Sequence, residues 1–285
     1  MTRPGGMIRA ALLAAVLLAA GPAYPEAGTW LDRLPARLLD QGSTRADLEA
    51  LLLAYPGLVR SLEAEYDEIG LVLGEGRRLR YDDRRPKTFE EKLADPDLED
   101  LFSQEYRPGP VTGPVPEDFD PGRFRPEAFF RAAYGDSAGE VRAALVPVVL
   151  AGRRVLFNRR HGAAEALGLV GGELESLAAK EPGLKKYLVP LGGTFNWRVI
   201  EGADRLSPHS FGLAVDLNPK HGAYWRWSPD RTPALVHKMR LEYPYQIVAV
   251  FERHGFIWGG KWFHFDLMHF EYRPELFLRA AAGGR

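Results

Sequence analysis

The sequence predicts an α+β fold, because it combines helical periodicity, a hairpin pattern and a series of short apolar strands. In residues 30–62 apolar side chains recur near the helix period, and residues 163–179 have the composition of a second helix. From residue 188 onward the apolar runs become short and aromatic residues become frequent. We therefore expect a mixed, largely helical N-terminal region, followed by a part that combines short strands with helices.

Shorter patterns give further elements. A hairpin is expected over residues 71–81, where two short runs flank a glycine-containing turn. Strands are expected at residues 141–150 and 154–157, on either side of a second turn. Residues 232–254 are expected to be largely helical, and Gly255 is expected to end that segment.

A Pro/Gly-rich stretch at residues 107–126 is the best candidate for a boundary in the chain. Its closely spaced prolines favour a loop or linker over regular secondary structure. We accordingly divide the chain into an N-terminal accessory region, residues 24–126, and a C-terminal domain, residues 127–285. The accessory region carries no motif to which a chemistry can be assigned.

Residues 1–23 have the pattern of a secretory signal peptide. Arg3 and Arg9 flank a short basic start, and the apolar run at residues 10–20 is too short for a bilayer-spanning helix of about 20 residues. Small residues follow, and we expect cleavage near Ala23. A short buried helix or an uncleaved anchor is the alternative. The signal predicts a secreted or periplasmic protein with no membrane segment after its removal.

The composition limits the chemistry that the protein can use. Lys and Arg number 37 against 38 Asp and Glu, so the sequence lacks the basic excess typical of nucleic-acid-binding proteins. The chain has no cysteine, which excludes disulfides, thiol nucleophiles and thiolate metal ligands. Any metal must therefore be held by histidines and carboxylates.

The first candidate motif lies at residues 207–216, Ser-Pro-His-Ser-Phe-Gly-Leu-Ala-Val-Asp. Apolar and other residues alternate near its end, so we expect a strand with Asp216 on one face. His209 precedes Asp216 by an odd number of positions, which would place the two on opposite faces of a continuous strand. A turn at Gly212 can bring both side chains to one point.

The second candidate motif spans residues 258–271 and contains Asp266 and His269. A metal hydrolase needs ligands and a separate base that reaches the reacting water. A bend between Asp266 and His269 could direct one side chain toward the metal and the other toward the reacting water. Taken singly, each has a structural alternative: a histidine among aromatic residues is often hydrogen-bonded in a core, and an aspartate after a strand often forms a turn.

Together the two motifs resemble those of the zinc D-Ala-D-Ala peptidase family, the VanY-like peptidases, which include endolysin-type L-Ala-D-Glu peptidases. The first family motif, Ser-x-His-x-x-Gly-x-Ala-x-Asp, is complete in residues 207–216. The second, an acid followed after two residues by a histidine, is present in Asp266 and His269. The resemblance covers residues 188–276. It implies a small, mainly antiparallel sheet with flanking helices, as in the lysostaphin, D-Ala-D-Ala peptidase and hedgehog group.

The resemblance also implies roles for individual residues. His209, Asp216 and His269 correspond to the ligands of one zinc ion per chain. Asp266 corresponds to the general base. Arg198 matches the arginine that stabilises negative charge on the substrate in this family, although an ordinary surface arginine would look the same.

Further residues near the motifs are assigned to the surroundings of the site. Ser207, Glu271 and Trp258 are predicted to contact the substrate. For Ser207 the alternative is orientation of a ligand, and for Glu271 it is a hydrogen bond to a ligating histidine. His264 is expected to be a wall of the site or structural. The pair His264-x-Asp266 also imitates part of an iron oxygenase site, but the distant second histidine that such a site needs does not follow.

The expected function is hydrolysis of amide bonds in peptidoglycan stem peptides by a zinc-dependent peptidase. The motifs leave open a D,D-carboxypeptidase, which needs a group that binds the terminal carboxylate, or an L-Ala-D-Glu-type endopeptidase. An aromatic stretch at residues 224–227 is expected to line a groove or to pack in the core. A non-catalytic, zinc-containing cell-wall binding protein of the same fold is the alternative. Asp266 and Arg198 favour the enzyme, because a binding protein requires neither.

Overall fold

The computed structural model describes residues 27–40 and 42–283, and the predicted signal peptide at residues 1–23 lies outside them. The order of elements begins with α2 (Ala27–Leu31), α3 (Ala36–Leu39), α4 (Thr44–Ala54), β1 (Val59–Glu65), β2 (Glu68–Leu73), β3 (Arg78–Arg80), α5 (Phe89–Ala94), α6 (Glu127–Tyr134) and α7 (Ala138–Ala144). It continues with β4 (Leu145–Leu150), β5 (Arg153–Asn158), α8 (Ala163–Lys180), α9 (Lys185–Leu188), β6 (Ala214–Asp216), α10 (Pro233–Glu242), α11 (Tyr245–Arg253), β7 (Phe256–Trp258), β8 (His269–Tyr272) and α12 (Pro274–Gly283). In this part of the chain no helix combines the length and apolar character needed to cross a bilayer.

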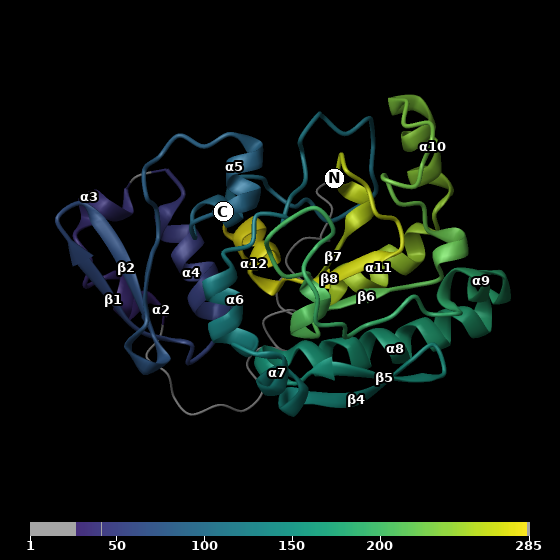
Figure 1. Cartoon of the computed structure of the whole chain (residues 1–285), viewed down its shortest axis with the longest axis horizontal. Coiled ribbons are helices and arrows are strands. Elements are labelled where there is room, and N and C mark those ends of the chain that lie inside the picture. Colours follow the sequence, from purple (N-terminus) through teal and green to yellow (C-terminus); the bar gives the residue numbers. More distant parts are fainter. Residues whose placement is uncertain (1–26, 41, 284–285) are drawn as a thin grey trace, which may run out of the picture.

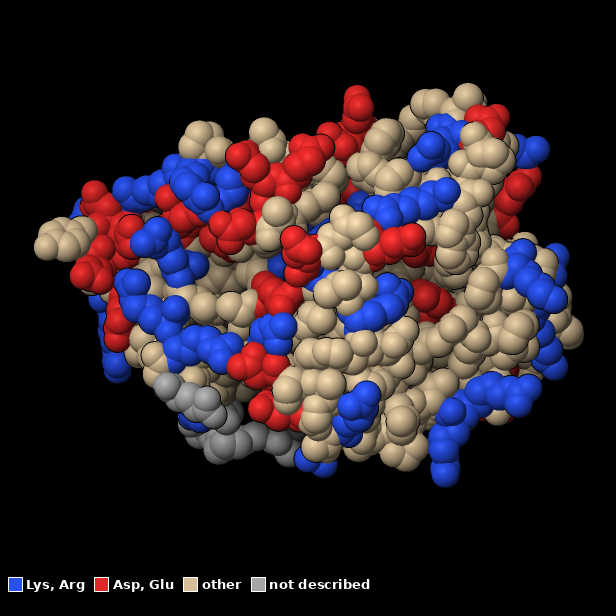
Figure 2. All heavy atoms as spheres, in the orientation of Figure 1, with Lys and Arg blue, Asp and Glu red and all other residues tan. Residues whose placement is uncertain are grey.

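Within the described residues the strands form three small antiparallel sheets among helices, so the predicted α+β class is confirmed. The first sheet has the order β1-β2-β3, the second pairs β4 with β5, and the third has the order β6-β8-β7. Figure 1 shows β1 and β2 at the left end of the molecule, β4 and β5 along its lower edge, and the third sheet nearer the centre. On the face in Figure 2 basic and acidic side chains are interspersed, in keeping with the mixed charge of the sequence.

The third sheet fixes the position of β8. This strand pairs on one side with β7, where Trp258 lies opposite Phe270, and on the other side with β6. All four residues of β8 are buried. From α11, Phe251 stacks on Phe270 with ring centroids 3.9 Å apart. The first residue of the strand, His269, therefore has a rigid support.

Residues 59–62 correct the predicted helix at 30–62. Helix α4 ends at Ala54, and Gly57 adopts a positive φ of 77°, which turns the chain out of the helical direction. The following residues pair with β2 as β1, with Leu62 opposite Leu71. Pairing between strands therefore outweighs the local helical periodicity. The predicted hairpin at 71–81 is confirmed by β2 and β3.

Residues 141–144 correct the predicted strand at 141–150, because α7 continues to Ala144 and β4 begins only at the next residue. The hydroxyl of Ser137 caps this helix by accepting a hydrogen bond from the N–H of Glu140 (3.2 Å). The other predicted elements are confirmed as β5, α8 and the pair α10 and α11. Gly255 follows the last of these with a positive φ of 80°.

Residues 107–126 contain no regular helix or strand, as predicted, and they pack along the C-terminal part of the chain. The carbonyl of Phe119 accepts a hydrogen bond from the N–H of Phe263 (2.9 Å), and the carbonyl of Pro121 accepts one from Nε1 of Trp262 (2.8 Å). One hydrophobic core contains buried residues from both sides of the predicted boundary. The division at residue 126 stays a prediction.

A chain of buried polar groups joins the N-terminal region to the last helix. Tyr55, which follows α4, donates its hydroxyl hydrogen to Glu275 of α12 (2.8 Å), and Glu275 also accepts a hydrogen bond from Arg273. Arg273 and Glu275 are both 0% exposed. Removing one partner of a buried ion pair is costly, because the other charge remains in a low-dielectric environment.

We expect Glu275→Ala to lower the free energy of unfolding by about 3 kcal/mol, because Arg273 would lose a buried carboxylate partner. The control is Glu242→Ala, which removes an exposed carboxylate 3.6 Å from Lys238. That variant should lose less than about 1 kcal/mol. Urea unfolding followed by circular dichroism measures both, and equal losses would contradict the role of the buried pair.

Candidate metal centre

A short turn ahead of β6 directs His209. Ser207 precedes a 3-10 helix at Pro208–Phe211, and its hydroxyl oxygen accepts a hydrogen bond from the N–H of His209 (3.3 Å). Gly212 ends this turn with a positive φ of 66°, and a Cβ at that position would lie 2.6 Å from the side chain of Leu145. Glycine is therefore required here, and the predicted change of direction is confirmed. Ser207 is itself buried and positions His209.

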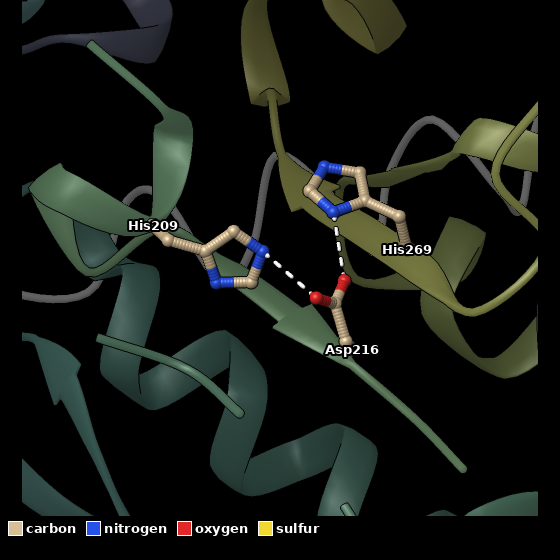
Figure 3. A group of neighbouring side chains, drawn as sticks. All are labelled: His209, Asp216 and His269. Carbon is tan, nitrogen blue, oxygen red and sulfur yellow. Dashed lines mark hydrogen bonds and ion pairs between the residues drawn. The ribbon is translucent and has the colours of Figure 1, made fainter. Parts of the chain in front are cut away.

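Asp216 lies between two imidazole rings, as Figure 3 shows. It is opposite His269 in the pairing of β6 with β8, so both side chains lie on the same face of the sheet. One carboxylate oxygen is 2.9 Å from Nδ1 of His269, and the other is 3.2 Å from Nε2 of His209. The structure therefore brings the three predicted ligands together.

The three side chains form a donor set that fits zinc. Their ligand atoms all lie within 4.8 Å of one another. A tetrahedral zinc with nitrogen and oxygen ligands at about 2.0–2.1 Å separates neighbouring ligand atoms by roughly 3.3 Å. The observed separations of 2.9 and 3.2 Å are close to this value. Three protein ligands also leave one coordination position open, as in catalytic zinc sites.

The other ring nitrogens of the two histidines have their own partners. Nδ1 of His209 donates to the carbonyl of Thr194 (2.5 Å), which leaves Nε2 facing Asp216. Nε2 of His269 lies 3.8 Å from a carboxylate oxygen of Glu271. Such outer partners set the tautomer and orientation of ligating histidines. The role of Thr194 has no signal in the sequence, because it is played by a backbone carbonyl.

Glu271 lies next to His269, in keeping with the alternative that the sequence leaves open for it, a partner of a ligating histidine. Its side chain is 0% exposed, and its oxygens are 3.4 Å from Arg125 and 3.3 Å from Arg273. Burial alone would raise the pKa of Glu271, but the charge of Arg125 and the other cationic neighbours lowers it to about 2. Within the described chain its Oε2 has no hydrogen-bond partner. An ionised carboxylate therefore faces a metal ligand.

Asp266 lies beside the three ligands and is not one of them. A tight turn holds it: the N–H of Asp266 donates to the carbonyl of Gly259 (3.0 Å), and the N–H of His269 donates to the carbonyl of Asp266 (3.3 Å). Burial raises the pKa of Asp266 to about 7, while His269 acts to lower it and Asp216 to raise it. Its Oδ1 is buried and unpaired among the described residues. A carboxyl group of this kind is suited to accept a proton near neutral pH.

Arg198 is exposed at the edge of this centre. Its backbone N–H donates to Oγ of Ser210, the residue after His209, at 2.9 Å. Its guanidinium reaches the carbonyl of Val199 at 3.5 Å. The backbone of Arg198 is therefore tied to the turn that carries a ligand, while the side chain points into solvent.

Trp258, which the sequence assigns to substrate contact, is 2% exposed, and that assignment stays a prediction. Its Nε1 donates to the carbonyl of Leu267 (2.8 Å), and its ring packs against Tyr243 with centroids 5.2 Å apart. Leu267 lies in the turn between Asp266 and His269. Trp258 therefore supports that turn from inside the core.

Two other histidines and the other acidic groups have partners of another kind. His254 lies 2.7 Å from Glu173, and Nδ1 of His264 lies 2.7 Å from Asp120. Two acidic groups in residues 82–100 also bring oxygens close together. The ammonium of Lys87 lies within 3.1 Å of three of those carboxylates and offsets part of their negative charge.

Residues 201–272 match a family model described as D-alanyl-D-alanine carboxypeptidase. The predicted family is confirmed for this segment. At the family level the match indicates a peptidase that acts on peptidoglycan. The matched segment includes the three predicted ligands and Asp266, whereas Arg198 lies just ahead of it. No curated protein and no solved structure matches the chain.

We expect zinc binding to weaken as the pH falls. In the metal-free protein burial acts to lower the pKa of His269, but Asp216 and the other acidic neighbours raise it to about 10. The imidazole therefore carries a proton at neutral pH, and this proton must leave before Nδ1 can bind a metal. Calorimetric titration in buffers of different ionisation enthalpy should show release of about one proton per zinc from this group. Binding without proton release would contradict this expectation.

We expect Glu271→Gln to lower zinc affinity about 10-fold to 100-fold, because a neutral amide no longer stabilises the N–H of His269. Glu173→Gln is the matched control, since it removes a carboxylate from His254, a histidine outside the centre. Competition with a chelator measures both affinities. Equal affinities for the two variants would show that Glu271 does not act on the metal site.

Proposed function

We propose that the protein is an exported zinc peptidase, with one zinc ion per chain, that hydrolyses amide bonds in peptidoglycan stem peptides. The observation that carries the proposal is the convergence of His209, Asp216 and His269 beside Asp266, in a segment that matches a peptidase family. Export rests on the signal pattern at residues 1–23, which would deliver the protein to the compartment where peptidoglycan is found.

In this proposal the metal is held by Nε2 of His209, Nδ1 of His269 and the carboxylate of Asp216. Zinc bound there supplies Lewis acidity and makes water nucleophilic at neutral pH. The carbonyl of Thr194 holds the ring of His209 through its Nδ1, and the charge of Glu271, 3.8 Å from Nε2 of His269, favours a proton on that nitrogen.

Asp266 is proposed to accept the proton that the attacking water loses and to pass it to the leaving amine. A pKa of about 7 allows the same carboxyl group to take up and release a proton near neutral pH. Its buried Oδ1 has no hydrogen-bond partner among the described residues that would compete with the reacting water.

Arg198 is proposed to stabilise the negative charge that develops on the substrate carbonyl oxygen. Its backbone is tied to Ser210 beside His209, and its exposed guanidinium has a flexible stem. Rotation of that stem can direct the cation toward a bound substrate without movement of the backbone.

The bond that is cut belongs to one of two classes, the terminal D-Ala-D-Ala bond or an internal L-Ala-D-Glu bond of the stem peptide. The alternative function is a zinc-containing wall-binding protein without catalysis. Asp266 separates the two functions, because a binding protein has no use for a carboxyl group with a buried, unpaired oxygen beside the metal ligands.

We expect Asp266→Ala to reduce hydrolysis of muropeptides by at least about 100-fold while the protein retains zinc, because Asp266 accepts a proton and does not bind the metal. His209→Ala should lose both zinc and activity. Asp230→Asn changes an exposed loop carboxylate, which accepts a hydrogen bond from the N–H of Thr232 (3.0 Å), and should keep both.

Mass spectrometry of digested muropeptides and metal analysis of the purified variants give the two readouts. If the wild-type protein carries one zinc per chain and cleaves no muropeptide, the enzyme is excluded and the binding protein is favoured.

A further inference from the structure

A pocket of about 190 Å³ lies close to the proposed active site. Its lining combines aromatic rings with cationic and imidazole side chains: Trp225, Phe263, Phe265, Arg231, Arg240 and His264. Phe265 directly precedes Asp266, and Tyr224 pairs with Asp266 through an isolated bridge. The N–H of Trp225 donates to the carbonyl of Phe265 (2.9 Å). The pocket and the proposed base therefore share one stretch of backbone.

Arg240 of α10 is a buried cation, 5% exposed, without a salt bridge in the part of the chain that the structure describes. Its Nε and Nη2 donate to the carbonyls of Gly260 (2.7 Å) and Trp262 (2.6 Å), which fix the plane of the guanidinium. Burial lowers its pKa to about 10, and Asp120 offsets only part of that effect. A buried charge with so little compensation favours the binding of an anion.

Arg231 lies at the mouth of the same pocket and is exposed. Its guanidinium is 5.5 Å from the centre of the Trp225 ring, a cation–π contact that leaves its N–H groups available. Arg226 lies over the same ring at 5.3 Å, but it is not part of the pocket lining and donates to the carbonyl of Glu201 (2.8 Å). Substitution of Arg231 therefore tests the pocket, and the same substitution of Arg226 serves as its control.

His264 has a fixed orientation in the wall of the pocket. Its backbone N–H and its Nδ1 both bond to the carboxylate of Asp120, at 3.0 and 2.7 Å, and Asp120 is 0% exposed. Its ring stacks on Phe89 with centroids 5.6 Å apart. Because Nδ1 is bound to Asp120, Nε2 lies on the opposite side of the ring and remains available to a ligand.

We propose that this pocket binds a carboxylate group of the peptide substrate, within a few residues of the amide bond on which Asp266 acts. The proposal rests on the proposed peptidase function and specifies how its substrate is recognised. The lining offers two guanidinium groups and no carboxylate, and its aromatic walls accept the short apolar part of an amino-acid residue. Neighbouring Cα atoms of a peptide are about 3.8 Å apart, so a carboxylate close to the scissile bond suits a pocket adjacent to the base.

Two carboxylates of a stem peptide have this chemistry, the terminal one of D-Ala and the free α-carboxylate of a D-Glu linked through its side chain. The test measures calorimetric binding to the zinc-loaded Asp266→Ala protein, in which no turnover interferes. The probes are diacetyl-L-Lys-D-Ala-D-Ala with its C-terminal amide, and acetyl-L-Ala-γ-D-Glu-L-Lys amide with the D-Glu α-carboxylate free or amidated.

We expect the acid of one pair to bind about 10-fold to 100-fold more tightly than its amide, the range for loss of a charged hydrogen bond. If the acid binds more tightly than the amide in the D-Ala-D-Ala pair, the pocket binds the terminal carboxylate, which favours a carboxypeptidase. If the acid binds more tightly than the amide in the D-Glu pair, the pocket binds the internal α-carboxylate, which favours an endopeptidase. In either case Arg231→Gln, added to Asp266→Ala, should remove the difference, whereas Arg226→Gln should leave it unchanged.

The proposal is overturned if acid and amide bind equally in both pairs, or if the substitutions of Arg231 and Arg226 have the same effect. These results are independent of catalysis, because the binding is measured in a variant that does not turn over. Failure of the wild-type protein to cleave muropeptides would instead overturn the peptidase proposal and leave the acid-to-amide comparison intact.

Discussion

The antiparallel register between β6 and β8 places Asp216 opposite His269, and the metal centre depends on that register. A shift of one residue would turn Asp216 to the other face of the sheet and separate the two ligands. The register is held by apolar contacts, since β8 is buried between its two neighbouring strands and stacks on α11 through Phe270. The third ligand reaches the same point only because Gly212 reverses the chain in a left-handed conformation.

A second layer of charged groups surrounds the ligands, and part of it comes from outside the segment that matches the peptidase family. Arg125 lies against Glu271, which faces His269, and Asp120 orients His264 in the neighbouring pocket. Both residues belong to the proline-rich stretch that the sequence marks as a linker. This stretch therefore contributes to the electrostatics of the site, because its polar side chains enter the C-terminal part of the core.

Two aspartates close together have opposite titration behaviour for a physical reason. Asp216 accepts contacts from both imidazoles, and these outweigh the effect of burial and hold the pKa of its carboxyl well below the usual range. Asp266 is buried with an unpaired oxygen, and burial raises its pKa to about 7. Environments that separate two carboxyl groups in this way are typical of sites where one group binds and the other transfers protons. The cationic pocket beside Asp266 adds a third environment, which favours an anionic group of a ligand.

The sequence by itself selected the residues of the candidate metal centre, since the spacing of the two motifs and their resemblance to a peptidase family pointed to His209, Asp216 and His269, which the structure brings together. It also predicted α8 and the pair α10 and α11, because their periodicity and end signals are local. The tertiary structure decided two elements that the local pattern does not specify. Residues 59–62 form a strand because they pair with β2. Residues 141–144 are helical and belong to the helix that Ser137 caps. The tertiary structure also showed that Glu271 and Trp258 are buried beside the segments that carry the candidate ligands. Burial and the partners of a side chain depend on segments far apart in sequence, which is the physical reason that these roles emerged only in the folded chain.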